Sequence, residues 1–170
     1  MKRLSRKWNA LMAVTAALLL QSAALAAKNV EHVKNGVVTR VVDGDTLWVD
    51  VAGTVLKVRI TGMDAPEICQ HGGREARDAL RSRVLRQGVT LTYQRHDDYG
   101  RMLARLQLNG DDLGRWMVAQ GHAWSYGYRK YPGPYGSEQQ HAQSMRLGLF
   151  ASSGAENPRD FRKRHGSCFR

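Results

Sequence analysis

Acidic residues and cysteine are scarce in this sequence. Its 170 residues include 15 Asp and Glu against 26 Lys and Arg, a formal net charge of +11. The only cysteines are Cys69 and Cys168, and two cysteines so far apart, without a paired histidine nearby, exclude a zinc site. The 6 histidines follow no metal-binding spacing, and the chain has neither internal repeats nor low-complexity segments. With 42% hydrophobic and 24% charged residues, the composition excludes a disordered, collagen-like or multi-span membrane protein.

Long hydrophobic runs are also absent. The apolar run at residues 11–20 is too short to span a bilayer. It follows a basic start at residues 2–7 and precedes an Ala-Leu-Ala cleavage motif at residues 24–26. This order predicts a secretory signal peptide over residues 1–26, so we expect an exported protein, periplasmic or extracellular. Its removal takes away four basic residues and leaves a net charge of +7, which favours a polyanionic partner or simply solubility.

The two cysteines suit an oxidising compartment. Cys69 and Cys168 either form one disulfide or stay free, because sequence does not show whether their Cβ atoms come within bonding distance. A bridge would tether the loop around Cys69 to the C-terminal segment.

Periodicity predicts one domain. Segments rich in β-branched residues, bounded by turns, are expected to be strands: residues 37–42, 46–51, 55–60, 89–93 and 102–108. Segments with helical spacing are expected to be helices, the second capped by Asp112: residues 75–86, 112–120 and 137–148. We therefore expect an α+β fold, a five-stranded OB-fold β-barrel with about three helices packed outside. It would occupy residues 27–152, before a basic C-terminal tail at residues 153–170 that holds nucleic acid non-specifically.

Three carboxylates stand at turns that end strands. Asp45 follows Asp43-Gly44, and Asp64 and Glu67 flank the turn at Pro66. Carboxylates in such places are suited to bind a hard cation such as Ca²⁺. Asp-Gly and Asp-x-Pro are also ordinary turn sequences, and each alone is more often only that.

Two arginines favour a catalytic role for these carboxylates over simple turn formation. Arg59 lies on the outward face of the strand at residues 55–60, and Arg101 closes the loop at residues 97–100. Guanidinium groups neutralise a phosphodiester and hold its developing oxygens with paired hydrogen bonds.

Three separated segments then resemble the thermonuclease family, the secreted staphylococcal-type nucleases. They are residues 42–46 (VDGDT), residues 58–67 (VRI and DAPE) and residues 97–104 (DDYGRMLA), with a weaker match at residues 121–124. The resemblance covers about residues 36 to 150 and implies Ca²⁺-dependent hydrolysis of DNA and RNA with low sequence specificity, leaving 3′-phosphate ends.

The resemblance also implies roles for individual residues. Asp45 and Asp64 would bind Ca²⁺ through their carboxylates and Ala65 through its backbone carbonyl, with Asp43 nearby. Glu67 would orient or deprotonate the attacking water. The scissile phosphate would be bound, and the transition state stabilised, by Arg59 and Arg101.

Further positions near the site are less specific. Tyr99, Tyr126 and Tyr128 either stack on a base or hydrogen-bond a terminal phosphate, or serve packing. Asp98 stands where many relatives have Lys or Arg, which removes positive charge from the substrate loop.

Two other functions fit these residues less well than a nuclease does. A non-catalytic OB-fold protein that binds single strands has no need of three carboxylates facing a polyanion. A basic membrane-surface protein would need an amphipathic helix with a large apolar face, which is missing. We expect DNA and RNA as substrates, a monomer, no stable protein partner, and no membrane association after signal cleavage.

Overall fold

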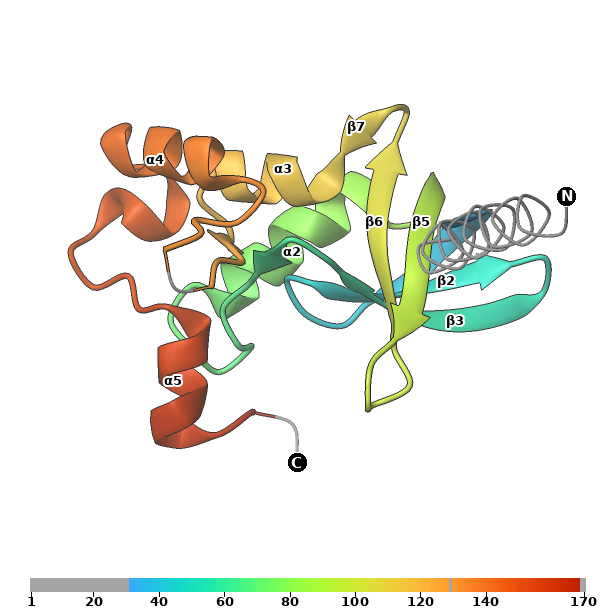
Figure 1. Cartoon of the computed structure of the whole chain (residues 1–170), viewed down its shortest axis with the longest axis horizontal. Coiled ribbons are helices and arrows are strands. Elements are labelled where there is room, and N and C mark those ends of the chain that lie inside the picture. Colours follow the sequence, from blue (N-terminus) through green and yellow to red (C-terminus); the bar gives the residue numbers. More distant parts are fainter. Residues whose placement is uncertain (1–30, 129, 169–170) are drawn as a thin grey trace, which may run out of the picture. The chain divides into compact units, whose positions relative to one another are not determined.

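Five strands of the computed structural model, which describes residues 31–128 and 130–168, form a closed barrel (Figure 1). The signal peptide predicted at residues 1–26 lies outside the described residues. The barrel strands are β1 (His32–Val41), β2 (Thr46–Val51), β3 (Thr54–Ile60), β5 (Gly88–His96) and β6 (Met102–Leu108). Neighbours run antiparallel in the order β3-β2-β1-β5-β6, and a parallel pairing of β3 with β6 closes the ring. The predicted five-stranded OB-fold barrel is confirmed.

Short strands extend this framework. β7 (Asp111–Asp112) continues the sheet beyond β6, and β4 (Met63–Asp64) pairs with β8 (Trp124–Ser125) as a separate ribbon. The pairing of β4 with β8 sets Asp64 opposite Trp124. This ribbon fixes the backbone of a carboxylate that the sequence marks as functional.

Helices cover the outside of the barrel. The described ranges contain α2 (Gly73–Val84), α3 (Leu113–Ala119), α4 (Gly136–Ser144) and α5 (Pro158–His165), with a 3₁₀ turn η2 (Gly148–Ala151). The first three match the predicted helices, although α4 ends earlier than expected. Figure 1 shows α3 and α4 together, while α5, in red, stands apart near the C-terminus. No helix in the described ranges is long and apolar enough to cross a bilayer.

The prediction that Asp112 caps α3 is also confirmed. Its Oδ1 accepts a hydrogen bond of 3.0 Å from the backbone N–H of Arg115. Both Asp112 oxygens also accept from the Tyr135 hydroxyl at 3.0 Å. One carboxylate thus satisfies a free N–H of the helix and ties α3 to the start of α4.

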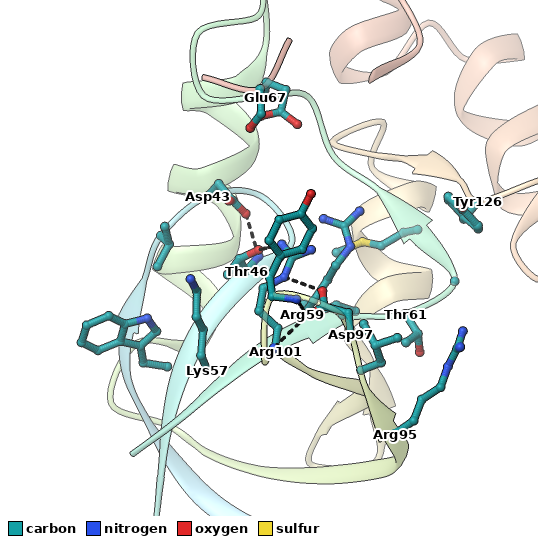
Figure 2. Close-up of a pocket in the computed structure, with 18 of the residues that line it drawn as sticks. Asp43, Thr46, Lys57, Arg59, Thr61, Glu67, Arg95, Asp97, Arg101 and Tyr126 are labelled. Atoms are coloured by element: carbon teal, nitrogen blue, oxygen red, sulfur yellow. Dashed lines mark hydrogen bonds and ion pairs between the residues drawn. The ribbon is translucent and has the colours of Figure 1, made fainter. Parts of the chain in front are cut away.

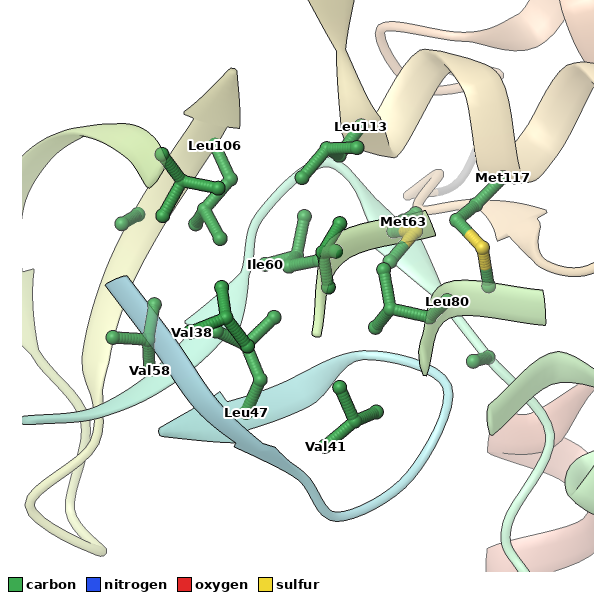
Figure 3. Packing of buried hydrophobic residues seen from close by; sticks show 14 of the residues in the cluster. Val38, Val41, Leu47, Val58, Ile60, Met63, Leu80, Leu106, Leu113 and Met117 are labelled. Atoms are coloured by element: carbon green, nitrogen blue, oxygen red, sulfur yellow. The ribbon is translucent and has the colours of Figure 1, made fainter. Parts of the chain in front are cut away.

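The core combines the inner faces of the strands with α2 and α3 (Figure 3). On β3, Val58 and Ile60 are buried, Lys57 is exposed, and Arg59 is half-buried. This alternation is the one that the sequence predicts for β3. It turns Arg59 away from the core because successive side chains of a strand point to opposite faces.

Barrel closure brings distant residues to one place. Thr46 of β2 pairs with Arg59 of β3, and Arg59 pairs with Leu103 of β6. Asp45 precedes Thr46, and Arg101 lies two residues before Leu103. The starts of β2 and β6 therefore meet the end of β3 at one edge of the barrel.

Gly44 allows the turn before β2 to pack closely. A Cβ at Gly44 would lie 2.6 Å from the Cβ of Ala65 and 2.9 Å from that of Ala76 on α2. Real carbon atoms do not approach so closely. A larger residue would push the turn, and Asp45 with it, away from the site.

Candidate active site

Arg59 joins two buried carboxylates at this edge of the barrel. Its Nη1 lies 2.8 Å from Asp45 Oδ1, and its Nη2 lies 2.8 Å from Asp64 Oδ1. Asp45 and Asp64 are each only 3% exposed. Burial alone would lower the pKa of the Arg59 guanidinium, but the two carboxylates raise it above its usual value. Arg59 is therefore held as a cation between them.

The surroundings of Asp45 neutralise only part of its negative charge. Thr46 Oγ1 donates to its Oδ1 at 3.0 Å, and the backbone N–H of Ala65 donates to its Oδ2 at 3.3 Å. Burial nevertheless raises the pKa of Asp45 to about 7, against the lowering effect of Arg59. Arg59 thus offsets only part of the cost of burying this charge.

Asp43 shapes the turn that presents Asp45. Its Oδ1 accepts from the backbone N–H of Asp45 at 3.0 Å and from that of Thr46 at 2.7 Å. These bonds form an Asx turn, which fixes the backbone at Asp45.

Glu67 lies in the loop between β4 and α2. Gln70 anchors this loop, since its Oε1 accepts from the Glu67 N–H at 3.2 Å and its N–H donates to the Glu67 carbonyl at 2.8 Å. A Cβ at Gly73, the first residue of α2, would collide with that carbonyl. Close packing against α2 therefore fixes the backbone of Glu67.

The C-terminal segment supplies the contacts of the Glu67 carboxylate. Arg162 Nη1 lies 3.1 Å from Oε1, and Ser167 Oγ donates to Oε2 at 3.2 Å. Arg162 also reaches Asp64, with Nη2 2.7 Å from Oδ2. The segment interpreted from sequence as a basic tail therefore carries α5 and brings a further arginine into the site.

A disulfide holds this arrangement. The structure bonds Cys69 to Cys168, with Cα atoms 5.9 Å apart and a separation of 99 residues. Cys69 lies two residues after Glu67 and Cys168 lies one residue after Ser167. The bond therefore ties the Glu67 loop directly to the C-terminal segment.

Asp97 orients Arg101. Arg101 Nε donates to Asp97 Oδ2 at 2.7 Å, and its Nη1 lies 3.5 Å from Thr46 Oγ1. Asp97 Oδ1 accepts from the backbone N–H groups of Tyr99 and Arg101, at 3.0 and 2.8 Å. Although burial tends to raise it, hydrogen bonds from Arg101 hold the pKa of Asp97 below its usual value. Asp97 therefore aims the guanidinium, a role that we did not derive from the sequence.

Replacing Asp97 tests this positioning. In Asp97→Asn the turn keeps an oxygen acceptor, but Arg101 loses its ionic partner. We expect nucleic-acid cleavage to fall about tenfold, because a displaced guanidinium binds phosphate less well in the transition state. Initial rates and melting temperatures of the variant and the wild type measure the effect. The matched control is Asp98→Asn, an exposed neighbour with the same charge change. Equal losses in both variants would contradict the positioning role.

Several of these groups line one cleft of about 890 Å³ (Figure 2), among them Arg59, Glu67, Arg101 and Arg162. The buried carboxylates of Asp45 and Asp64 are not part of its lining and reach it through their contacts with Arg59 and Arg162. Figure 2 shows Thr46, Arg59 and Arg101 together in the middle of the cleft, with Glu67 at one side. Tyr99, 81% exposed, and Tyr126, 55% exposed, line it with rings available to a ligand. Tyr128 is exposed and pairs with Tyr131, but it is not among the residues that line the cleft.

No preformed metal cluster is visible in residues 31–128 and 130–168. No three His, Cys, Asp or Glu side chains of these ranges come together as a group that would hold a metal ion. The acidic side chains here are paired with guanidinium groups instead: Arg59 bridges Asp45 and Asp64, and Arg162 bridges Asp64 and Glu67.

A family model described as staphylococcal nuclease homologue matches residues 57–152, more than half of the chain. The chain belongs to this family. Its sequence is 36% identical over 141 residues to a micrococcal nuclease of Shigella flexneri, covering 75% of this chain and 80% of that protein. It is 34% identical over 131 residues to an uncharacterized endonuclease of Escherichia coli O157:H7, covering 76% and 86%.

Membership in the staphylococcal nuclease homologue family makes this chain a hydrolytic nuclease, as the sequence motifs predict. Its substrates are nucleic acids. The region matched by the family model contains Arg59, Asp64, Glu67 and Arg101, whereas Arg162 lies beyond its end at residue 152. The third arginine of the site therefore comes from outside the matched region.

Proposed function

We propose that this nuclease is exported and cleaves DNA and RNA in a Ca²⁺-dependent reaction of low sequence specificity that leaves 3′-phosphate ends. The observation that carries the proposal is the pair of buried carboxylates, Asp45 and Asp64, joined by Arg59 beside Glu67 and Arg101. Buried carboxylates beside a cleft that binds a polyanion are costly unless cations neutralise them, and Arg59 offsets only part of the charge of Asp45.

The ligand chemistry of the site fits a hard cation. Asp45 and Asp64 offer only carboxylate oxygens, which Ca²⁺ prefers. The raised pKa of Asp45 supports this fit, because a divalent cation would stabilise the ionised carboxylate that burial disfavours. Ala65 presents its N–H to Asp45 in this structure, and ligation by its carbonyl remains a proposal.

The chain's own residues would perform the remaining steps. Arg59 and Arg101 would bind the scissile phosphate and stabilise the charge that develops on its oxygens. Glu67 would orient the attacking water and accept its proton. The bound cation would supply Lewis-acid polarisation of the phosphoryl oxygen.

The cleft supports action on both nucleic acids. Besides the two central arginines, its lining includes the cationic side chains of Arg40, Lys57 and Arg95. Such groups contact phosphates, which DNA and RNA share, and phosphate contacts carry no direct sequence information. Tyr99 and Tyr126 offer rings on which any base could stack.

Export rests on two features. The signal peptide predicted at residues 1–26 lies outside the described residues, so it stays a prediction. The Cys69–Cys168 disulfide supports it, because such bonds persist in oxidising compartments.

Digestion of plasmid DNA and RNA by the chain from residue 27 onward tests the proposed function. We expect cleavage with Ca²⁺ to exceed that with chelator by about a hundredfold or more. The ends should resist polymerase extension until a phosphatase treats them. Asp45→Asn should lose the response to Ca²⁺, whereas Asp50→Asn, the same change within β2, should keep it.

Each part of this proposal has its own contrary result. Nucleic acid that is bound but never cut at any Ca²⁺ concentration would contradict the nuclease assignment. Undiminished cleavage with chelator would contradict only the cation. Ends that a polymerase extends without phosphatase treatment would contradict only the 3′-phosphate product.

A further inference from the structure

The segment that follows the family-matched region is attached at both ends to the Glu67 loop. Near its start, Gln70 Nε2 donates to the backbone carbonyl of Glu156 at 2.8 Å, and Gln70 is only 7% exposed. At its end, Cys168 is bonded to Cys69. Helix α5 lies between these two attachments, so it is held beside the site.

Arg162 extends from α5 into the acidic side of the cleft. Its guanidinium takes both oxygens of Asp64, with Nη2 2.7 Å from Oδ2 and Nη1 3.1 Å from Oδ1. Nη1 also lies 3.1 Å from Glu67 Oε1. The remaining oxygen of Glu67 accepts from Ser167 Oγ at 3.2 Å. Groups from the C-terminal segment thus engage every carboxylate oxygen of Asp64 and Glu67.

This arrangement conflicts with cation binding at Asp64. Oδ1 of Asp64 accepts from Arg59 and Arg162, and Oδ2 accepts from Arg162. A cation needs at least one of these oxygens turned towards it, and it repels a nearby guanidinium. If Arg59 moved away from Asp64, it would keep its hydrogen bond to Asp45. Arg162, in contrast, would lose its bidentate contact with Asp64.

We propose that Arg162 is a tethered competitor for the divalent cation: its guanidinium occupies Asp64 and Glu67 until the cation displaces it. This inference rests on the proposed function, which assigns the cation to Asp45 and Asp64. The C-terminal segment then sets the cation concentration at which the nuclease becomes active.

The two attachments make this competition strong. A guanidinium on a short, doubly held segment has a high effective concentration at its binding site. The apparent dissociation constant of the cation equals its intrinsic value divided by the fraction of molecules in which Arg162 leaves Asp64 uncovered, so it rises steeply as that fraction becomes small. Opening the disulfide removes one attachment and lowers that effective concentration. Oxidation of Cys69 and Cys168 therefore raises the cation requirement.

Calorimetric titration of Ca²⁺ into the oxidised chain from residue 27 onward, without nucleic acid, tests the competition. We expect Arg162→Gln to bind Ca²⁺ about tenfold more tightly than the wild type, because a charge-assisted bidentate pair no longer opposes it. The matched control, Arg159→Gln, removes the same charge from an exposed position on α5 and should bind as the wild type does. A Cys69→Ser/Cys168→Ser variant should shift in the same direction as Arg162→Gln.

The contrary results separate this inference from the proposed function. Equal or weaker Ca²⁺ binding by Arg162→Gln, with clear binding by the wild type, overturns the competition and leaves the cation assignment intact. An equal gain in Arg159→Gln also overturns it, because net charge alone would then explain the effect. Absence of binding in all variants refutes the cation site and the competition with it.

Cleavage assays at varied Ca²⁺ distinguish competition from direct contact with substrate. Competition predicts that Arg162→Gln lowers the Ca²⁺ concentration needed for half-maximal cleavage. A loss of rate at saturating Ca²⁺, with an unchanged half-saturating concentration, would assign Arg162 to the substrate phosphate and overturn the proposal.

Discussion

Arg59→Ala is expected to lower the rate of nucleic-acid cleavage by about a thousandfold. Among residues 31–128 and 130–168, Arg59 is the single cation that joins Asp45 to Asp64, and it stands in the middle of the cleft beside Arg101. Its loss removes the guanidinium proposed to stabilise the phosphate, and it takes from Asp45 the ionic partner that the described part of the chain provides. The charge arrangement and the transition-state contact are therefore lost together.

Removal of this partner should also destabilise the fold without cation. Breaking a buried ion pair by deleting one member costs about 3 to 5 kcal/mol, and Arg59 is partly exposed, so the lower part of that range applies. Added Ca²⁺ should restore part of this loss, because a cation can take over the charge of Asp45 and Asp64. Thermal unfolding with Ca²⁺ and with chelator measures both effects.

Two variants separate the role of Arg59 from charge and from general damage. Arg59→Lys keeps a positive charge but lacks the planar fork that spans two carboxylates, so we expect it to stay well below the wild type. Arg105→Ala removes an arginine from β6 whose side chain is 61% exposed, and it should cleave normally. If Arg59→Lys cleaves as fast as the wild type, the paired hydrogen bonds of the guanidinium are not needed.

Local patterns account for the correct part of the sequence analysis. Alternation on β3 predicted that Arg59 faces away from Val58 and Ile60, and β-branched segments separated by turns predicted the barrel. Contacts between residues within one turn were also predictable, as with the capping of α3 by Asp112. In these cases the determining contacts lie within a few residues, or follow from the period of a strand.

Local sequence patterns did not predict that Arg162 enters the site. Helix α5 is rich in Lys and Arg and ends close to the C-terminus, which in sequence resembles a solvated basic tail. Its position depends on contacts made 95 to 101 residues away in sequence, through Asp64, Glu67 and Cys69. The two cysteines were the one feature of the sequence that suggested contact between the Cys69 loop and the C-terminal segment. They did not indicate which side chain of that segment would enter the site.

The role of Asp97 was only partly predictable from the sequence. Its segment was recognised through the motif that ends in Arg101, but an aspartate two residues before Tyr99 also suits an ordinary turn. It performs both tasks, with Oδ1 holding the turn and Oδ2 holding the guanidinium. A turn-forming role and a positioning role are therefore compatible in one aspartate.

Glu67→Gln is expected to lower the turnover of the nuclease by a factor of roughly 10² to 10⁴, the range for loss of a general base. Glutamine has nearly the same shape and can still accept a hydrogen bond from Ser167 Oγ. It cannot accept a proton from water at neutral pH. Turnover should fall while the loop held by Gln70 and the Cys69–Cys168 bond keeps its place.

The decisive feature of this variant is that turnover and Ca²⁺ affinity should change in opposite directions. Glu67 pairs with Arg162 alongside Asp64, so neutralisation of Glu67 weakens the binding of that guanidinium to the site. Ca²⁺ should then bind slightly more tightly as cleavage falls, whereas local unfolding of the loop would weaken both. Glu75→Gln, an exposed and equivalent charge change on α2, should alter neither quantity. A parallel loss of cation binding and turnover in Glu67→Gln would instead assign Glu67 to cation ligation.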